Sequence, residues 1–159
     1  MTRFGLLLFA LVLKPLVFAQ SAPEGAWLQD GAKWSKAPRE YNPKLHFART
    51  AIIYFGADHT FALIYATVNR VPEEYEVISN GDGQEVYLGT WSIADDTIAL
   101  NYRLVRRTVQ AKGEQLPGPM KTESARRRGL ALVFLGHSFH RSAALDESAR
   151  QVAVPRGGR

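Results

Sequence analysis

Arginine is the residue type whose spacing in this sequence most clearly suggests a binding site. Arg103, Arg106 and Arg107 fall within one segment of alternating apolar and polar residues, and residues 126–128 form a second run. A guanidinium group binds a carboxylate or a phosphate through two parallel hydrogen bonds, so such a stripe could hold the anionic end of a ligand. The competing interpretation is a solvated strand face, whose charges discourage edge-to-edge association.

Aromatic residues that could line the apolar side of such a site lie close by in the sequence. Arg103 and Arg107 are expected to share one strand face and to hold the polar end of a small amphipathic or anionic molecule. Tyr87, Trp91 and Tyr102 would then form the nearby wall, unless these side chains belong to the core. The sequence therefore predicts a ligand-binding site made of Arg103, Arg107, Tyr102, Trp91 and Tyr87.

Metal-ligating residues are few. His137 and His140 are three positions apart, a spacing that places two side chains together on a helix but on opposite faces of a strand, and their segment has strand composition. Zinc sites need three or four protein ligands. Residues 80–85 (NGDGQE) partly match a calcium loop, but glycine and asparagine at a tight turn explain them equally well. We expect no metal and no cofactor.

Catalytic motifs are also missing from the sequence. The 159 residues include no cysteine, no G-x-S-x-G and no H-E-x-x-H, and Gly81 and Gly83 lack the third glycine of a nucleotide-binding loop. Asp58 and His59 are the one pair from which a catalytic site could start. We therefore predict that the protein is not an enzyme.

The amino terminus has the anatomy of a secretory signal peptide. Arg3 precedes an apolar stretch over residues 4–13, and Val17-Phe18-Ala19 supplies small residues for cleavage before Gln20. The apolar stretch is too short to cross a bilayer, which needs about 20 residues. Cleavage would lower the net charge from +5 to +3, since residues 1–19 contain two basic residues and no acidic one. We predict an exported protein, periplasmic or secreted, without a transmembrane span after cleavage and without a nucleic-acid partner.

The mature chain is predicted to be an all-β domain over residues 20–142. Segments rich in β-branched and aromatic residues alternate with turn signals, of which Asn80-Gly81-Asp82-Gly83 is the strongest hairpin signal. Such a single antiparallel meander closes most simply into a small up-and-down barrel, with a β-sandwich as the alternative. The expected strands cover residues 47–55, 60–68, 75–79, 85–93, 97–109, 130–135 and 138–142.

Two segments are expected to lack regular structure. Residues 110–129 are polar and contain Pro117, Gly118 and Pro119, so a long flexible loop is predicted there, either a lid or a dispensable insertion. Residues 143–159 are predicted to form a disordered tail, with a short helix over residues 143–150 as the alternative.

Side-chain alternation shows which strand faces should be buried. In the segment 97–109, Ile98, Leu100, Tyr102 and Leu104 share one face and polar residues share the other. The segments within 47–68 are instead apolar on both faces. Such strands must be packed inside and covered outside, or must offer a surface to a partner.

Three motifs resemble those of lipocalin-like (calycin-like) exported β-barrel proteins. Gly25-Ala26-Trp27 resembles the G-x-W opening of lipocalins, residues 55–61 resemble a hairpin of short bacterial relatives, and residues 87–100 resemble their Gly-x-Trp and Ile-x-Leu segment. The T-D-Y segment of lipocalins is absent, and no C-terminal helix is evident. The resemblance implies a barrel that binds small hydrophobic molecules or serves as an envelope-stress accessory protein.

Two classes of function follow. The first is a non-enzymatic binding module for a small amphipathic or anionic molecule. The second is an envelope interaction or structural protein with a filled barrel and no ligand, whose contact surface would be the apolar strands within 47–68, including Ile64 and Val68. The sequence leaves the oligomeric state open.

Overall fold

The computed structural model describes residues 22–38, 40, 42–79, 83–110 and 112–154. The leader predicted over residues 1–19 and the end of the tail, residues 155–159, lie outside this range. The strands are β1 (Gly25–Gln29), β2 (Ser35–Lys36), β3 (His46–Phe55), β4 (Thr60–Val71), β5 (Tyr75–Ile78), β6 (Glu85–Ala94), β7 (Thr97–Arg107), β8 (Lys121–Arg128), β9 (Ala131–Phe134) and β10 (His137–Arg141), and they are followed by a short 3₁₀ turn (Ala143–Leu145) and helix α1 (Asp146–Ala153).

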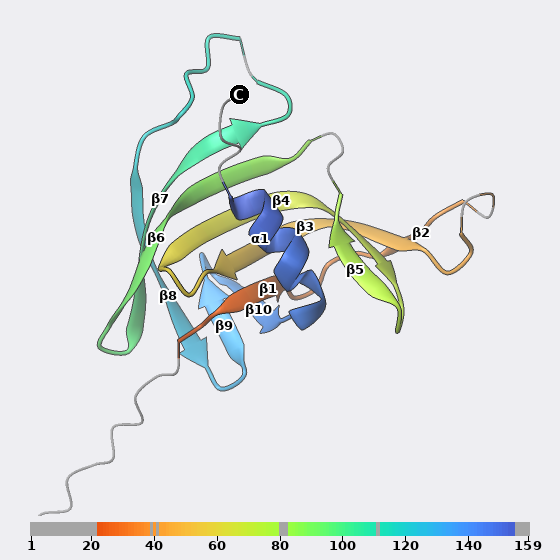
Figure 1. Ribbon diagram of the computed structural model, residues 1–159, viewed down its shortest axis with the longest axis horizontal. Helices are drawn as coiled ribbons and strands as arrows, with labels where there is room; N and C mark the ends of the chain where they lie inside the picture. The colour runs from red at the N-terminus through yellow and green to blue at the C-terminus, as the bar shows by residue number, and fades with distance from the viewer. Residues whose placement is uncertain (1–21, 39, 41, 80–82, 111, 155–159) are drawn as a thin grey trace, which may run out of the picture.

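Eight of the strands close into an antiparallel barrel (Figure 1). Strands β3, β4, β6, β7, β8, β9 and β10 follow one another around the wall, and β1 closes it between β10 and β3. The predicted up-and-down barrel is confirmed, and the sandwich alternative is wrong. Closure removes most of the free strand edges, which is the usual reason why a meander of this length forms a barrel.

Strands β5 and β6 do not form the hairpin that the Asn80–Gly83 turn predicted. Both pair antiparallel with the same edge of β4, β5 at Val68–Val71 and β6 at Thr60–Tyr65. They therefore run in the same direction, one after the other, along this edge of β4. Residues 80–82 of this predicted turn lie outside the described residues. The long β4 edge, with room for both strands, decides the pairing.

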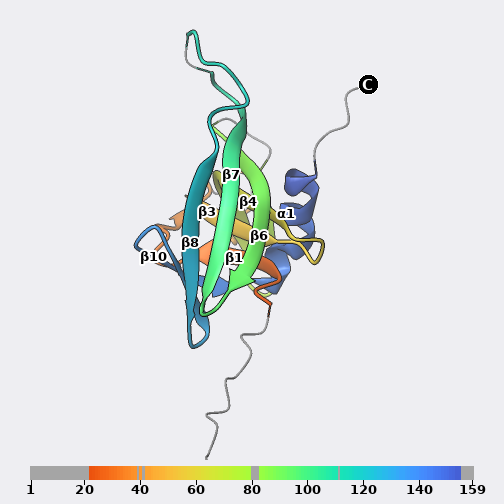
Figure 2. The same cartoon turned by 90° about the vertical axis from the view of Figure 1, so that its left-hand side faces the viewer.

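Residues 121–128 are a strand, which corrects the predicted loop over 110–129. The sequence KTESARRR has little strand propensity, yet β8 pairs with β7 through Lys121–Ala125 and with β9 through Ala125–Arg128. Closing the barrel requires a strand at this position, and the backbone hydrogen bonds on both sides outweigh side-chain propensity. The remaining connection, residues 108–120, rises above the barrel in Figures 1 and 2.

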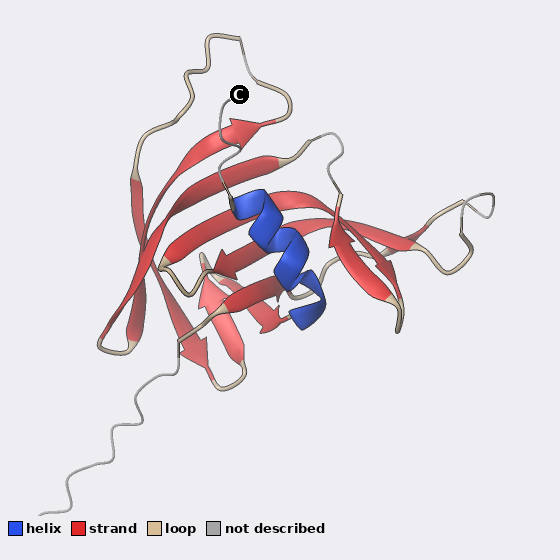
Figure 3. Ribbon diagram, viewed as in Figure 1, coloured by secondary structure: helices blue, strands red, loops and turns tan. Residues whose placement is uncertain are grey.

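The predicted disordered tail is wrong for residues 143–153, which form the 3₁₀ turn and α1. This segment lies on the outside of the barrel (Figures 2 and 3). Leu145, Ala149 and Val152 pack on an outward-facing apolar cluster that includes Ile64 and Val68 of β4. Strands that are apolar on both faces are thus packed inside and covered outside by this chain's own C-terminal segment, as one of the two expectations for 47–68 required.

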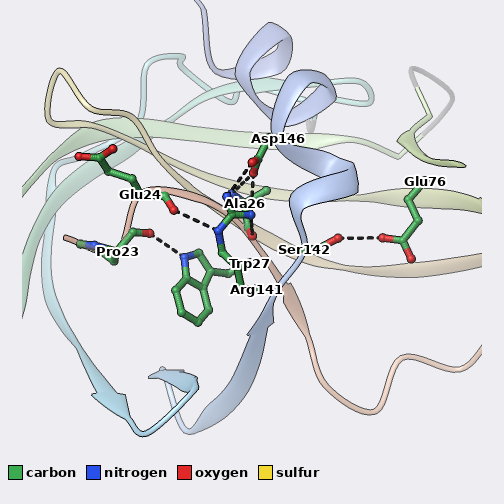
Figure 4. A network of polar contacts seen from close by, with 8 residues as sticks. All are labelled: Pro23, Glu24, Ala26, Trp27, Glu76, Arg141, Ser142 and Asp146. Carbon is green, nitrogen blue, oxygen red and sulfur yellow. Dashed lines mark hydrogen bonds and ion pairs between the residues drawn. The ribbon is translucent and has the colours of Figure 1, made fainter. Parts of the chain in front are cut away.

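A polar network ties α1 to the first barrel strand (Figure 4). The Asp146 carboxylate accepts hydrogen bonds from both terminal nitrogens of Arg141, at 2.7 and 2.6 Å, and from the Ala26 backbone N–H at 2.7 Å. Ser142 Oγ donates to Glu76 at 2.8 Å, which adds a link to β5. Trp27 Nε1 donates to the Pro23 carbonyl at 2.7 Å, so the segment before β1 folds under the lower end of the barrel.

Candidate functional site

The barrel interior has two parts of different construction. In the lower part, which we call the closed half, inward-facing side chains pack into one cluster, and none of them is more than 5% exposed. The cluster contains Trp27, Ala51, Ile53, Phe55, Phe61, Leu63, Trp91, Ile98, Leu100, Tyr102, Ala125, Leu132, Phe134 and Phe139. Because these side chains fill the space between the walls, the closed half has the character of an ordinary core.

The upper part, which we call the open half, is walled on one side only. Strands β1, β9 and β10 have 5, 4 and 5 residues, whereas β3, β4, β6 and β7 have 10 to 12. Residues 48–51 of β3 pair only with β4, and residues 121–124 of β8 pair only with β7. The short strands do not reach these levels. The concave face of the longer strands is therefore open there, and its inward-facing side chains remain solvent-accessible.

Three tyrosines mark the boundary between the two halves, and we call them the tyrosine layer: Tyr65 on β4, Tyr87 on β6 and Tyr102 on β7. The ring centroids of Tyr65 and Tyr87 are 6.2 Å apart and those of Tyr87 and Tyr102 are 6.0 Å apart, both edge-on. Tyr102 also packs on Phe61 of the closed half at 5.3 Å. Tyr102 is buried, whereas Tyr65 and Tyr87 are half-buried. The layer thus gives the apolar core a hydroxyl-bearing upper surface.

The phenols of this layer are held in their neutral form. Burial raises the pKa of all three, and Glu85 adds to the effect at Tyr65 and Tyr87. For Tyr102, burial first and then the charge of Glu123 raise the pKa to about 12. Neutral phenols can donate hydrogen bonds to a carbonyl or carboxylate oxygen while their ring edges contact an apolar body.

Arg107 stands above the layer, but two carboxylates already hold it. Its guanidinium lies 3.3 Å from Glu85 and 2.7 Å from Glu114, and Tyr87 Oη donates to Glu85 at 3.4 Å. Burial opposes the charge on Arg107, but Glu85 and then Glu114 raise its pKa overall. These contacts attach the 108–120 connection to the barrel wall, so Arg107 serves this attachment and is poorly placed to bind a ligand anion.

Arg103 and Arg107 do not share a strand face, which corrects the prediction. Tyr87 pairs with Leu104 and Val86 pairs with Arg106, so Val105 is an extra residue in β7, a β-bulge. The bulge inverts the alternation beyond it. Arg103 is exposed on the outer face, and Arg106 also points outward, donating to the Val152 carbonyl of α1 at 3.3 Å. The predicted alternation of Ile98, Leu100, Tyr102 and Leu104 below the bulge is confirmed.

Trp91 is separated from the two predicted tyrosines. It lies in the closed half, edge-on to Phe55 at 5.7 Å, and its Nε1 donates to the Gly56 carbonyl at 3.0 Å. Tyr87 and Tyr102 do come together, as predicted. The structure therefore keeps Tyr87 and Tyr102 in one group, places Arg107 above them, and removes Trp91 and Arg103 from it.

The open half contains charged residues that the sequence analysis missed. Arg49 on β3 and Lys121 and Glu123 on β8 face inward, because they alternate with Ala51 and Ala125 of the interior cluster. Arg49 donates to the Gly83 carbonyl, and the Lys121 ammonium lies 5.2 Å from the centre of the Tyr87 ring. The position of Arg49 in FARTAIIYF could have revealed it. Lys121 and Glu123 could not be found, because their segment was not recognised as a strand.

Asp58 and His59, the one candidate start for a catalytic pair, make separate contacts. The Asp58 carboxylate accepts bonds from the N–H and hydroxyl of Thr60 at 3.1 and 2.7 Å. Those two bonds, the hydroxyl first, lower the pKa of Asp58. The His59 ring packs at a tilt against Trp91, with ring centroids 4.8 Å apart, and its Nδ1 lies 3.2 Å from the Trp91 carbonyl oxygen. These contacts are those of a tight turn.

The remaining histidines do not converge. His137 and His140 lie on opposite faces of β10, and His140 Nδ1 lies 2.7 Å from Asp30. That hydrogen bond lowers the pKa of Asp30. Within the described part of the chain, no group of three or more His, Asp or Glu side chains could hold a metal ion.

A surface cleft opens at the lower end of the barrel, away from the tyrosine layer. It encloses about 520 Å³ between Pro23, Trp27, Arg127, Leu130 and Arg141. Its cations have internal partners: Arg141 binds Asp146, and the Arg127 guanidinium lies 5.6 Å from the centre of the Trp27 ring. Since these contacts close the lower end of the barrel, we assign the cleft a structural role.

The comparisons with known proteins add no relative. No protein-family model, no curated protein and no solved structure matches the chain. Among the described residues, no helix combines the length and apolar character needed to cross a bilayer.

Proposed function

We propose that the protein is an exported, non-enzymatic binding module that holds a small amphipathic molecule in the open half of the barrel. The observation that carries the proposal is the tyrosine layer. The half-buried, neutral phenols of Tyr65 and Tyr87 lie above buried Tyr102, on a concave face that no described strand covers on the opposite side. The proposal of export comes from the leader-like residues 1–19.

The depth of the site follows from the filled closed half. Below Tyr102, the interior cluster occupies the space that a deep ligand would need. A ligand would rest its apolar body on Tyr65, Tyr87 and Leu104, of which each remains partly accessible, and would keep its polar end toward solvent. A shallow site of this kind combines an apolar wall with a few polar groups, as small-molecule sites commonly do.

The first test is native mass spectrometry of the protein recovered without detergent from a host that exports it. We expect a chain that begins at Gln20 and carries a reproducible added mass. Independently, the neutral fluorescent probe N-phenylnaphthylamine should bind saturably to the recovered protein. A chain that keeps residues 1–19 would overturn the export proposal.

A matched pair of variants locates the binding. Thr67 faces inward beside Tyr65, so Thr67→Trp should obstruct the open half and weaken probe binding by about tenfold or more. Ser124 is exposed on the outer face of β8, so Ser124→Trp adds the same side chain outside the barrel and should leave binding unchanged. Equal effects of the two variants would contradict binding in the open half.

The second candidate is an envelope interaction or structural protein with a filled barrel. The packed closed half favours it, but Ile64 and Val68, the residues expected to contact a partner, are both 0% exposed beneath the C-terminal segment. A bare chain that neither retains a ligand nor binds the probe would favour this second candidate.

A further inference from the structure

Two cations point into the open half from strands on opposite sides of the barrel. Around the eight-stranded barrel, three strands separate β3 from β8 in either direction, so Arg49 and Lys121 extend from opposite walls. Each lies on the stretch of its strand that pairs on one side only. Among the described residues, neither has a carboxylate within ion-pair distance.

We infer that Arg49 and Lys121 select a ligand with a single anionic head group, an inference that rests on the proposed binding function. The Lys121 ammonium lies over the Tyr87 ring, and Arg49 is two residues from Ala51, the partner of Tyr65 on the neighbouring strand. The phenols of the layer are neutral at neutral pH. A carboxylate at the solvent-facing end of the ligand would meet these two cations, while its apolar body rests on the tyrosine rings. Charge-assisted hydrogen bonds of this kind are about twice as strong as neutral ones.

The acidic residues of the open half limit the charge that this site accepts. Glu85 and Glu114 are both engaged by Arg107, so they offer little to a cationic ligand. Glu123 faces the same space as Lys121 and raises the pKa of Tyr102 by its charge. Its negative charge would oppose a dianionic head group such as a phosphate monoester. The combined charge of Arg49, Lys121 and Glu123 therefore favours a head group that carries one negative charge.

The assignment differs from the one that the sequence suggested. Arg103 lies on the outer face and Arg107 is bound to two carboxylates, so neither cation is available in the open half. Both residues that take their place were outside the predicted set. The inferred ligand is still amphipathic, as predicted from the sequence, but its head group is now expected to carry one negative charge.

Three ligands with the same chain and different head groups test the inference. Dodecanoate, dodecanol and dodecylammonium would compete against N-phenylnaphthylamine for the wild-type protein. We expect dodecanoate to displace the probe about tenfold more strongly than dodecanol, and dodecylammonium to be the weakest. In the double variant Arg49→Gln/Lys121→Gln, the preference for dodecanoate should fall to within about threefold of dodecanol.

The control variant removes the same charge outside the barrel. Arg103 and Arg126 are exposed on the outer face, so Arg103→Gln/Arg126→Gln should keep the preference for dodecanoate. If the probe binds the wild type but the head groups compete equally, or if dodecylammonium competes best, the inference is wrong and the binding function stands. If the probe does not bind the wild type at all, the proposed function itself fails.

Discussion

The closed and open halves of the barrel share five strands but differ in how their inward-facing side chains are packed. In the closed half, inward-facing positions of every strand meet a neighbour on the opposite wall, and aromatic and aliphatic side chains fill the space. In the open half, the same alternation continues along β3, β4, β6, β7 and β8, but β1, β9 and β10 have ended. Inward-facing residues there include tyrosines and charged residues beside Thr67 and Leu104. The different lengths of the strands, and not the alternation of side chains, thus decide where the packed core ends and the candidate site begins.

The largest test of this comparison replaces one aromatic side chain in each half. Phe61 is 1% exposed and contacts Phe55, Tyr102 and Phe134, so Phe61→Ala should lower the free energy of unfolding by about 3–5 kcal/mol. Tyr65 is half-buried, so Tyr65→Ala should cost about 1–2 kcal/mol. Chemical denaturation followed by tryptophan fluorescence measures both. Equal losses would mean that the open half is packed as tightly as the closed half.

The ionisation of Tyr102 gives a second, pH-dependent test at the boundary. The phenol ionises at a pKa of about 12 in the folded protein, against an ordinary value of 10.0. Below pH 10 it is protonated in both states and adds no pH dependence. Between pH 10 and 12 the unfolded state loses a proton that the folded state keeps, so stability should fall as the pH rises.

The variant Tyr102→Phe isolates this group from the other tyrosines. It should unfold with a smaller loss of stability between pH 9 and 11 than the wild type, as measured by denaturant titration at each pH. In an alkaline titration followed by absorbance, the variant should also lack the phenol ionisation that occurs at the highest pH in the wild type. Parallel pH profiles for the two proteins would show that Tyr102 titrates normally.

The smallest expected effect concerns the two predicted arginines, on opposite faces of β7. Arg107→Gln leaves Glu85 and Glu114 without their shared cation, so the 108–120 connection should detach and trypsin should cleave after Lys112 about three- to tenfold faster. Arg103→Gln removes an exposed outer charge and should leave the cleavage rate unchanged. Mass spectrometry of the fragments separates this cut from others. Equal rates would contradict the assignment of Arg107 to loop attachment.

The sequence predicted a site of aromatic and cationic side chains, but it identified only some of the residues that form the candidate site. Tyr87 and Tyr102 were found because short-range alternation places them on the inner face. Trp91 was misplaced because alternation says nothing about height along the barrel axis. Arg107 was misplaced because the bulge at Val105 inverts the faces, and no glycine or proline marks that bulge in the sequence.

The C-terminal helix shows the same limit. A short helix over residues 143–150 was the alternative to the predicted disordered tail, and the structure has the 3₁₀ turn and α1 there. The eight residues DESARQVA are too few and too polar to form a stable helix alone, so most of the stability of the helix must come from packing on the barrel. The sequence did predict a surface in need of cover, since the strands within 47–68 are apolar on both faces. It could not say whether that cover came from this chain or from a partner.

The sequence by itself determined the strands with strong alternation, most of their boundaries and the all-β class, because side-chain direction repeats every two residues along a strand. The tertiary structure alone decided which strands pair, where the short strands end, that KTESARRR becomes β8, and that Arg49 and Lys121 both point into the barrel. These features depend on closure of the barrel, in which backbone hydrogen bonds between residues far apart in the chain outweigh local propensity.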